Sequence, residues 1–349
     1  MVRIASSSSL ARLVVVLALL ACGTALAVDQ LAPFNADATA TSVSGISSGG
    51  YMAVQFHVAY SATVSGVGVL AAGPYYCAQG NAVTAVNNCM SPSALAPVPR
   101  VALLKTITDT LAGAGLIDAT ANLKRAKVWL FTGKHDETVQ ANVVQALQAY
   151  YREYVPASAI TLVSNVDAGH AMVTDDYGGR CAATASPFIN DCHFDAAGKL
   201  LEHIYGKLNP AATKESGHVV AFDQAEFVAG SPYDVSLADT GYAYVPKSCE
   251  STRCKVHVAF HGCKQSAEAV GEKFVRHAGY NRWADSNGII VLYPQTISRS
   301  GFGVFSFTYI LNPNGCWDWW GYTGPEYHTH NGAQVRAVKA MVDRLMQPR

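Results

Sequence analysis

Ser47 stands in a segment whose residue types suit a reactive hydroxyl. It lies in the run Gly-Ile-Ser-Ser-Gly at 45–49, a G-x-S-x-G pattern, between a strand predicted over 41–44 and a helix predicted over 49–60. Glycines two positions before and after a serine permit the sharp strand-to-helix turn that presents a nucleophilic hydroxyl. The pattern predicts that Ser47 is the nucleophile of an acyl-transfer reaction. Ser48 is the alternative nucleophile, but its flanking glycines have the wrong spacing.

An acid and a base that could serve this serine follow it along the chain. Asp136 comes just after a strand predicted over 127–132, and His170 just after a strand predicted over 160–166. Open α/β sheets place their functional crevice at the carboxyl ends of the strands, so these side chains can meet above one edge. We therefore predict that the two complete a triad with the serine. Two alternatives remain open: Asp136 could cap the helix that follows it, and His135 could be the base.

The segments that must position these residues alternate between apolar strands and amphipathic helices. This alternation predicts an α/β fold with a mostly parallel sheet and helices on both faces. Strands are predicted over 41–44, 64–71, 127–132, 160–166, 242–246, 255–260 and 289–293, with a fragment at Phe222, and helices over 49–60, 93–112, 139–154, 197–205, 271–286 and 333–345.

The order of these segments is unusual. In an α/β hydrolase several strands precede the nucleophile, whereas here the serine lies near the start of the chain. The strand over 255–260 leads into the run His-Gly-Cys at 261–263, a turn of the kind that supplies an oxyanion-hole amide. The front half of the fold, at about 218–349, therefore follows the back half. We predict a circularly permuted α/β-hydrolase fold, in which the ordinary termini must lie close together.

The first 27 residues have the pattern of an export signal. Two arginines precede an apolar run over 13–21, and an Ala-Leu-Ala cleavage site ends at Ala27. Cleavage there would leave 28–349 as a single catalytic domain, secreted or periplasmic. The alternative is lipoprotein processing before Cys22. No other apolar run is long enough to predict a transmembrane helix.

Without the leader, eight of the nine cysteines remain. An even number in an exported protein predicts four disulfides. Their spacing suggests three local pairs and one long pair, although other connectivities are possible: Cys77–Cys89, Cys181–Cys192, Cys249–Cys254 and Cys263–Cys316. A zinc site is the weaker alternative, because the chain has no C-x-x-C motif.

The overall composition excludes several classes of protein. Lys and Arg number 25, Asp and Glu also 25, so no net charge would attract nucleic acid. Hydrophobic residues make up 50% of the chain and charged residues 14%, which excludes intrinsic disorder.

Four motifs, taken together and in this order, resemble a known family. They are Ser-Gly-Ile-Ser-Ser-Gly-Gly-Tyr-Met-Ala at 44–53, Ala-Tyr-Ser at 59–61, His-Gly-Cys-Lys-Gln-Ser at 261–266 and Asn-Gly-Cys-Trp-Asp-Trp-Trp-Gly-Tyr at 314–322. The chain resembles the poly(3-hydroxybutyrate) depolymerases of the single-domain, circularly permuted kind found in a fungus and in bacterial relatives. The resemblance extends over nearly all of the chain after the leader.

This resemblance implies a function and a set of roles. It implies a serine esterase with the triad Ser47, Asp136 and His170, an oxyanion hole formed by the backbone N–H groups of Ser48 and Cys263, and the four disulfides above. It also implies an apolar crevice with Trp320 at a subsite, and we expect the neighbouring Trp319 and Trp317 to help bind substrate. No metal or organic cofactor is expected.

The expected partner is a polyester polymer or its oligomers, bound by a monomer. We expect no separate polymer-adsorbing domain, so solid polymer would have to bind the catalytic domain itself. Tyr75, Tyr76 and the stretch 300–309 could then contribute an exposed aromatic surface. Two other functions stay open: a related secreted carboxylesterase acting on feruloyl or acetyl-carbohydrate esters, and a non-catalytic polymer-binding protein.

Overall fold

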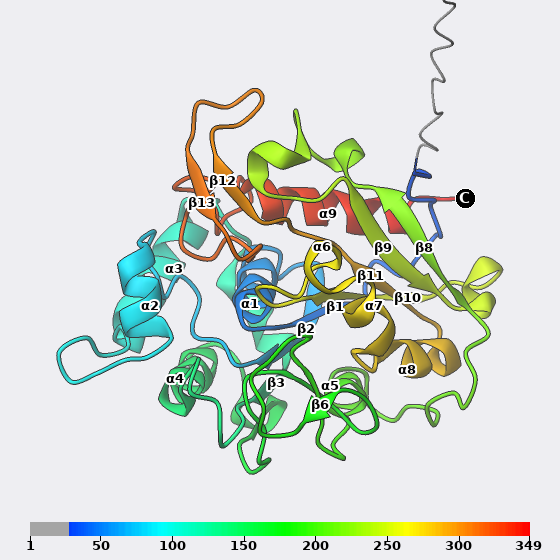
Figure 1. Cartoon of the computed structure of the whole chain (residues 1–349), viewed down its shortest axis with the longest axis horizontal. Coiled ribbons are helices and arrows are strands. Elements are labelled where there is room, and N and C mark those ends of the chain that lie inside the picture. The colour runs from blue at the N-terminus through cyan, green and yellow to red at the C-terminus, as the bar shows by residue number, and fades with distance from the viewer. Residues whose placement is uncertain (1–27) are drawn as a thin grey trace, which may run out of the picture.

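A computed structural model describes residues 28–349, so the predicted leader and Cys22 lie outside the described residues. A twisted central sheet crosses this part of the chain, with helices packed on each side of it (Figure 1). Strands from both halves of the sequence contribute to that sheet.

The central sheet has eight strands in the order β4-β3-β2-β1-β10-β11-β9-β8. All neighbours run parallel except β9, which is antiparallel to both β11 and β8. If the strands are renumbered so that β8 to β11 come first and β1 to β4 follow, the order across the sheet from the β8 edge is 1-2-4-3-5-6-7-8. This is the strand order of an α/β hydrolase. The bounds are β1 Thr41–Ile46, β2 Val64–Leu70, β3 Lys127–Phe131, β4 Ile160–Val163, β8 His218–Asp223, β9 Thr240–Val245, β10 Lys255–Phe260 and β11 Ile289–Tyr293.

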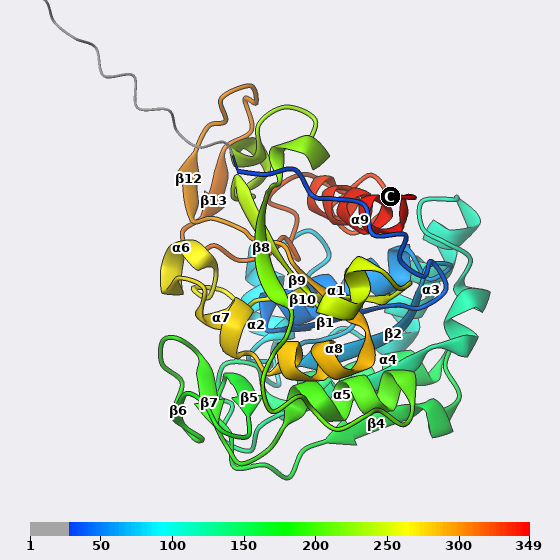
Figure 2. The same ribbon diagram turned by 90° about the vertical axis from the view of Figure 1, so that its right-hand side faces the viewer.

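The two ends of the described chain lie side by side, as the predicted permutation requires. The N–H groups of Phe34 and Ala36 donate to the carbonyl of Leu345, and that of Asn35 donates to the carbonyl of Gln347. Figure 2 shows the N-terminal segment running along the C-terminal helix. The predicted fold class, an α/β hydrolase with its strand order rotated, is therefore confirmed.

Helices cover both faces of the sheet because successive strand residues point to opposite sides. In β3, Val128 and Leu130 pack in one apolar cluster, whereas Trp129 and Phe131 pack in another. The first cluster takes in α1, α3, α4 and α9, and the second takes in α5, α7 and α8. The helices are α1 Ser48–Ala59, α2 Ala82–Cys89, α3 Val101–Gly113, α4 Ala141–Arg152, α5 Ala196–Tyr205, α6 Ala267–Val270, α7 Lys273–His277, α8 Tyr280–Asn287 and α9 Ala333–Met346.

Two predicted helices differ from those observed. The helix predicted over 93–112 begins only at Val101, because Pro97 and Pro99 prevent the preceding residues from joining it. The helix predicted over 271–286 is divided into α7 and α8 at Gly279, whose φ of +91° is incompatible with a continuous helix.

Short strands form two further structures that the sequence did not predict. The strand pieces β5 Met172–Thr174, β6 Gly179–Arg180 and β7 Ile189–Asp191 make a small sheet in the order β5-β7-β6. The strands β12 Arg299–Gly301 and β13 Ile310–Asn312 make a hairpin that projects from the body of the protein (Figure 1).

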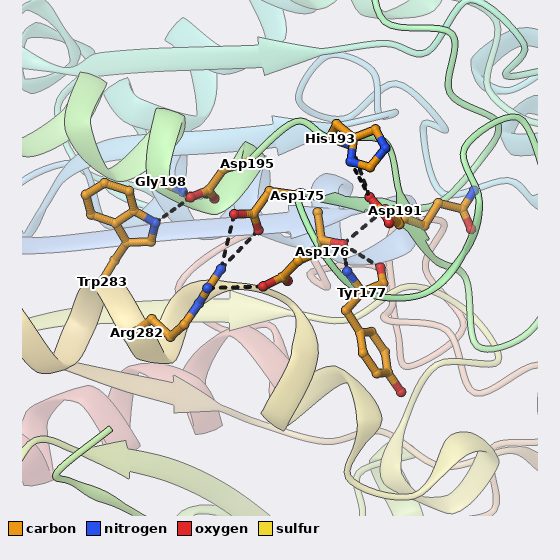
Figure 3. Close-up of polar contacts among 11 residues, drawn as sticks. Asp175, Asp176, Tyr177, Asp191, His193, Asp195, Gly198, Arg282 and Trp283 are labelled. Carbon is orange, nitrogen blue, oxygen red and sulfur yellow. Dashed lines mark hydrogen bonds and ion pairs between the residues drawn. The ribbon is translucent and has the colours of Figure 1, made fainter. Parts of the chain in front are cut away.

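The small sheet belongs to a long excursion between β4 and α5, which is fastened to α8 (Figure 3). Arg282 of α8 pairs with Asp175 at 3.0 Å and with Asp176 at 3.1 Å. The indole of Trp283 donates to Asp195 at 2.6 Å, and Asp195 also caps the N-terminus of α5. These contacts hold the far end of the excursion against the main domain.

Four disulfides join all eight cysteines of residues 28–349, in the pairs suggested from the sequence: Cys77–Cys89, Cys181–Cys192, Cys249–Cys254 and Cys263–Cys316. No thiol in this range is left to serve as the thiolate ligand of a zinc ion. None of the helices in the described residues has the length and apolar character needed to cross a membrane.

The adjacent ends make a direct test of the rotated order possible. Joining the C-terminus to residue 28 with a flexible linker, and opening the chain between Thr213 and Lys214, should give a folded protein with conventional strand order. We expect a cooperative thermal transition near that of the natural chain, because the cut breaks no strand and both cut ends lie in an exposed loop. Circular dichroism and calorimetry would measure it.

The control is the same linker with the cut placed inside β10, between His257 and Val258. That variant should lose its cooperative transition, because β10 lies between two parallel neighbours. Failure of the loop-cut variant to fold, with the linker long enough to span the ends, would contradict the permuted reading.

Candidate active site

Ser47 lies at the turn between β1 and α1, in a backbone conformation that is rare for a serine. Its φ is +56° and its ψ is −125°. Such a residue is strained and persists only where its surroundings hold it. Here the Ser47 N–H donates to the carbonyl of Leu70, and its carbonyl accepts from the N–H of Tyr51, each at 3.0 Å. The turn therefore has the geometry of a nucleophile elbow.

The two glycines of the motif are explained by what surrounds them. A Cβ on Gly45 would lie 2.2 Å from the carbonyl oxygen of Gly49. A Cβ on Gly49 would lie 2.3 Å from the carbonyl oxygen of His261 and 2.4 Å from that of Phe260. Only hydrogen side chains let α1 start so close to the end of β10.

Asp136 and His170 form a buried pair. The Nδ1–H of His170 donates to Asp136 Oδ2 at 2.8 Å, and the residues are 7% and 8% exposed. The other carboxylate oxygen accepts the N–H groups of Thr138 and Val139, both at 2.9 Å. Asp136 thus holds both its own turn and the imidazole. With its proton on Nδ1, a neutral ring leaves Nε2 free to accept one.

Ser47 and His170 line the same cavity, of about 230 Å³, together with Gly262 and Cys263. Within residues 28–349 no hydrogen bond joins the serine hydroxyl to the imidazole. The alternative base does not reach this cavity: His135 is half-exposed, and its ring nitrogen lies 3.8 Å from Asp167. Of the two histidines, only His170 lines the cavity with Ser47.

The two backbone N–H groups expected to form an oxyanion hole belong to Ser48 and Cys263. Neither Ser48 N–H nor Cys263 N–H has an acceptor among the described residues. The Ser48 hydroxyl is buried and likewise without a partner there, so it does not compete with Ser47 as an exposed nucleophile. Free N–H donors beside the serine could bind a developing negative charge.

The turn that carries Cys263 is held from several sides. Gly262 N–H donates to Gln265 Oε1 at 2.8 Å, and Lys264 N–H donates to the carbonyl of Asn314 at 2.7 Å. His261 Nδ1–H donates to the Gly262 carbonyl at 2.7 Å. The Cys263–Cys316 bridge adds a covalent tie. A turn fixed in this way is preorganised, as an oxyanion site requires.

A second, more apolar cavity of about 330 Å³ adjoins the first. Met90, Cys263 and Asn314 line both. Trp319 and Trp320 line the second, and Trp319 stacks on Tyr51 of α1 at a ring distance of 3.9 Å. The tryptophan segment is therefore attached to the helix that begins at the elbow.

Two aromatic predictions need correction. Trp317 is 0% exposed and packs on Phe260 and His261 in the core, so it cannot contact a substrate. Tyr75 is also fully buried and adds nothing to an exposed surface. The stretch 300–309 does carry exposed aromatic rings, and Phe307 at its tip is 98% exposed.

Buried histidines lie beneath the site. His257 of β10 bridges to β1, with Nδ1 2.6 Å from Ser42 Oγ and Nε2 2.7 Å from Ser44 Oγ. Burial lowers the pKa of His257 to about 3 and that of His261 to about 4. Both rings are therefore neutral near neutral pH. His257 joins the strands β1 and β10, and His261 joins the turn at Gly262 to Thr296, which follows β11.

Sequence reasoning missed several residues that support the site. Thr184 accepts the His170 backbone N–H at 2.9 Å, and Phe188 lines the cavity. Both belong to the irregular excursion, where no periodic pattern exists. Gln265 lies in the motif at 261–266, two residues after Cys263, but a glutamine there does not by itself indicate a role.

Strand order, elbow and buried acid–base pair together define the class of this protein, an α/β hydrolase with permuted strand order. No protein-family model matches the chain. A poly(3-hydroxybutyrate) depolymerase of Delftia acidovorans is 45% identical over 335 residues, which are 94% of this chain and 64% of that relative. A polyhydroxybutyrate depolymerase of Talaromyces funiculosus is 38% identical over 329 residues, 92% of this chain and 94% of the relative.

Two solved structures are similar in fold and sequence. A PHB depolymerase complexed with an R3HB trimer, in a variant with serine replaced by alanine, has a TM-score of 0.82 and 37% identity, covering 91% of this chain and 98% of that one. The crystal structure of PHB depolymerase from Penicillium funiculosum has a TM-score of 0.81 and 36% identity, with the same coverage. The chain belongs to the polyhydroxybutyrate depolymerase family.

The neutral buried histidines make stability depend on pH. An unfolded histidine has a pKa near 6.5, well above the values of about 3 and about 4 in the fold. Below about pH 6.5 the unfolded chain binds protons that the folded chain does not, so stability falls as pH drops toward 4, by up to about 1.4 kcal/mol per pH unit for each histidine.

His257→Asn should make this decline shallower, although it lowers stability at neutral pH through the lost bonds to Ser42 and Ser44. Urea unfolding at several pH values would measure the slope of unfolding free energy against pH. His193→Asn is the control, because the His193 side chain is 89% exposed. Equal slopes in His257→Asn and the natural protein would show that this histidine does not carry the effect.

Proposed function

We propose that the protein is a serine esterase that hydrolyses ester bonds of poly(3-hydroxybutyrate) or its oligomers through an acyl-enzyme. The observation that carries the proposal is the convergence of Ser47, on its strained elbow, and the buried Asp136–His170 pair on one cavity. The similarity to a PHB depolymerase whose structure contains an R3HB trimer supports the choice of substrate.

In the first step the Ser47 hydroxyl attacks the ester carbonyl, and His170 Nε2 takes its proton. Asp136 holds the imidazole through Nδ1 and stabilises the imidazolium that forms. The backbone N–H groups of Ser48 and Cys263 bind the oxyanion. By analogy with measured oxyanion donors, each contributes about 3–4 kcal/mol of transition-state stabilisation.

In the second step the ester C–O bond breaks, and His170 gives its proton to the leaving alcohol. Water then enters, His170 takes a proton from it, and the hydroxide attacks the acyl-enzyme carbonyl. The carboxylic acid leaves, and Ser47 recovers its proton. All catalytic groups in this scheme come from one chain.

The apolar cavity beside the catalytic one suits the repeat units flanking the scissile ester. Trp320 and Trp319 line it together with aliphatic side chains of α2 and β13. A polyester of short aliphatic units exposes mostly methyl and methylene groups, which gain from burial against such walls. We assign this groove to substrate binding through Trp320 and Trp319, and not through Trp317.

The hairpin of β12 and β13 extends the apolar surface away from the groove. Phe302, Phe305, Phe307 and Tyr309 at its tip are all more than half exposed, a concentration unusual for a protein surface that stays in water. Such a surface suits contact with solid polymer. The four disulfides suit an oxidising compartment, and we propose on that ground that the protein is exported. The exposed rings of the hairpin lead us to propose that the catalytic domain also adsorbs to the polymer it hydrolyses.

The nucleophile is tested by exchanging each serine of the elbow. Ser47→Ala should fold normally and lose about 10³-fold or more in kcat for a p-nitrophenyl ester. Ser48→Ala should stay active, because Ser48 is proposed to contribute its backbone N–H and its hydroxyl has no partner among the described residues. A fluorophosphonate should label the natural protein at Ser47. Full activity of Ser47→Ala, or label at Ser48, would overturn the assignment.

The groove is tested by Trp320→Ala with Trp320→Phe as its matched control. Loss of the aromatic wall should raise KM for a 3-hydroxybutyrate trimer by about 10-fold, whereas the small substrate p-nitrophenyl acetate should be spared. Trp320→Phe keeps a ring and should resemble the natural protein. Feruloyl esters serve as the comparison substrate. Faster turnover of feruloyl esters than of the trimer would redirect the proposal to another ester class.

A further inference from the structure

The base reaches the site from an unfavourable position in the sheet. Ser47 follows β1 and the oxyanion turn follows β10, which are adjacent strands. His170 follows β4, which is separated from β10 by β3, β2 and β1. The sheet therefore fixes Ser47 relative to the oxyanion turn. His170, by contrast, is carried by the excursion after β4, which must pass β3 and β2 to reach the end of β1. Something besides the sheet has to set the position of His170.

The excursion itself is internally rigid around the base. His170 N–H donates to Thr184 Oγ1 at 2.9 Å, and Gly169 N–H donates to the carbonyl of Cys181 at 2.8 Å. Met172 N–H donates to the carbonyl of Phe188 at 2.8 Å. The small sheet and the Cys181–Cys192 bridge connect these segments further. Whatever holds Phe188 also holds the segment that carries His170.

Gln265 binds this excursion and the oxyanion turn at the same time. Its side-chain Oε1 accepts the N–H of Gly262 at 2.8 Å. Its Nε2 donates to the carbonyl of Phe188 at 2.8 Å and to that of Pro187 at 3.2 Å. The residue is 1% exposed and also lines the catalytic cavity.

The orientation of this amide is determined by its partners. Reversing oxygen and nitrogen would set the NH₂ group against the Gly262 N–H and the oxygen against two carbonyl oxygens. All three bonds would be lost in a buried place, where each unpaired group costs about 1–3 kcal/mol. Gln265 therefore has one stable arrangement, with its acceptor on the oxyanion turn and its donor on the base segment.

We infer that Gln265 is a positioning residue that sets the base relative to the oxyanion donors. It touches no reacting atom and acts through the Phe188 carbonyl, which it shares with Met172, and through the Gly262 N–H, next to the donor of Cys263. The inference rests on the proposed esterase reaction, in which His170 and the oxyanion donors must act on one carbonyl group.

The sharpest variant is Gln265→Glu. An ionised glutamate still accepts from Gly262 N–H but cannot donate to Phe188, and it places negative charge against two carbonyl oxygens. A protonated glutamic acid can accept from the Gly262 N–H with one oxygen and donate to the Phe188 carbonyl with its O–H group. Burial and those carbonyls favour the protonated form. We expect kcat at about pH 8 to fall by about 10-fold or more, and its ratio to the natural enzyme to rise as pH falls toward about 5.

Gln265→Met removes donor and acceptor together. Its kcat should be low at every pH, with a ratio to the natural enzyme that does not vary, and KM for a p-nitrophenyl ester should stay within about threefold for both variants. Taking the ratio at each pH removes the pH dependence that variant and natural enzyme share. A merely structural glutamine would lower the melting temperature without producing this difference between the two variants.

Gln224 provides a matched control for lost hydrogen bonds. It is fully buried, its Oε1 accepts the N–H of Gln295 at 2.9 Å, and its Nε2 donates to the carbonyls of Ala238 and Gln295. The pattern equals that of Gln265 but lies in the β8–β9–β11 part of the fold. Gln224→Glu and Gln224→Met should lower the melting temperature similarly and leave kcat nearly unchanged.

A double-mutant cycle with Thr184→Val keeps the inference testable if the charged variant folds poorly. Both Thr184→Val and Gln265→Met loosen the base segment, so their effects on kcat should not add. Additive effects, or Gln265 variants with the kcat and pH profile of their Gln224 counterparts, would overturn the inference. Absence of ester hydrolysis by the natural enzyme would instead refute the proposed function, which separates the two failures.

Discussion

The site depends on the parallel pairing of β1 with β10. Both strands are central and almost wholly buried, and neighbouring strands lie only about 4.8 Å apart. Their carboxyl ends therefore place Ser47 beside the turn at Cys263 with no loop to span. Residue 49 must be a glycine, because α1 begins against the carbonyls at the end of β10 and a Cβ there would clash with them. His257 of β10 bonds both Ser42 and Ser44 of β1, and these side-chain bonds help to fix the register of the two strands.

Three of the four disulfides surround this centre. Cys263–Cys316 holds the turn after β10, and Cys181–Cys192 belongs to the excursion, in which the Cys181 carbonyl accepts the N–H of Gly169, next to His170. Cys77–Cys89 ends one residue before Met90, which lines both cavities. Covalent ties are concentrated where the chain is irregular and the sheet gives no support. Elements inside the sheet, by contrast, are held by backbone pairing, burial and side-chain hydrogen bonds such as those of His257 to Ser42 and Ser44.

Sequence reasoning succeeded where a residue's type and its periodic context agreed. The strands at 255–260 and 289–293 matched the structure because continuous apolar runs between turn residues leave little choice. Ser47, Asp136 and His170 were chosen as candidates because each follows such a strand, and in the structure Ser47 and His170 line one cavity while Asp136 bonds His170. Strands of two or three residues produce no period, so the small sheet and Gln265's partners were invisible. Trp317 was misjudged because composition cannot tell which face of a loop an aromatic ring takes.

The rotated strand order affects when the central strands can pair during synthesis of the chain. Ser42 and His257, paired across β1 and β10, are 215 residues apart in the chain. During synthesis the nucleophile strand emerges early and must wait for its central partner until most of the chain has been made. Contacts of such long range slow folding, because a large loop has to close before they form. A nascent or truncated chain that ends before β10 therefore carries the serine of the elbow without the turn at Cys263, whose backbone N–H is proposed to bind the oxyanion.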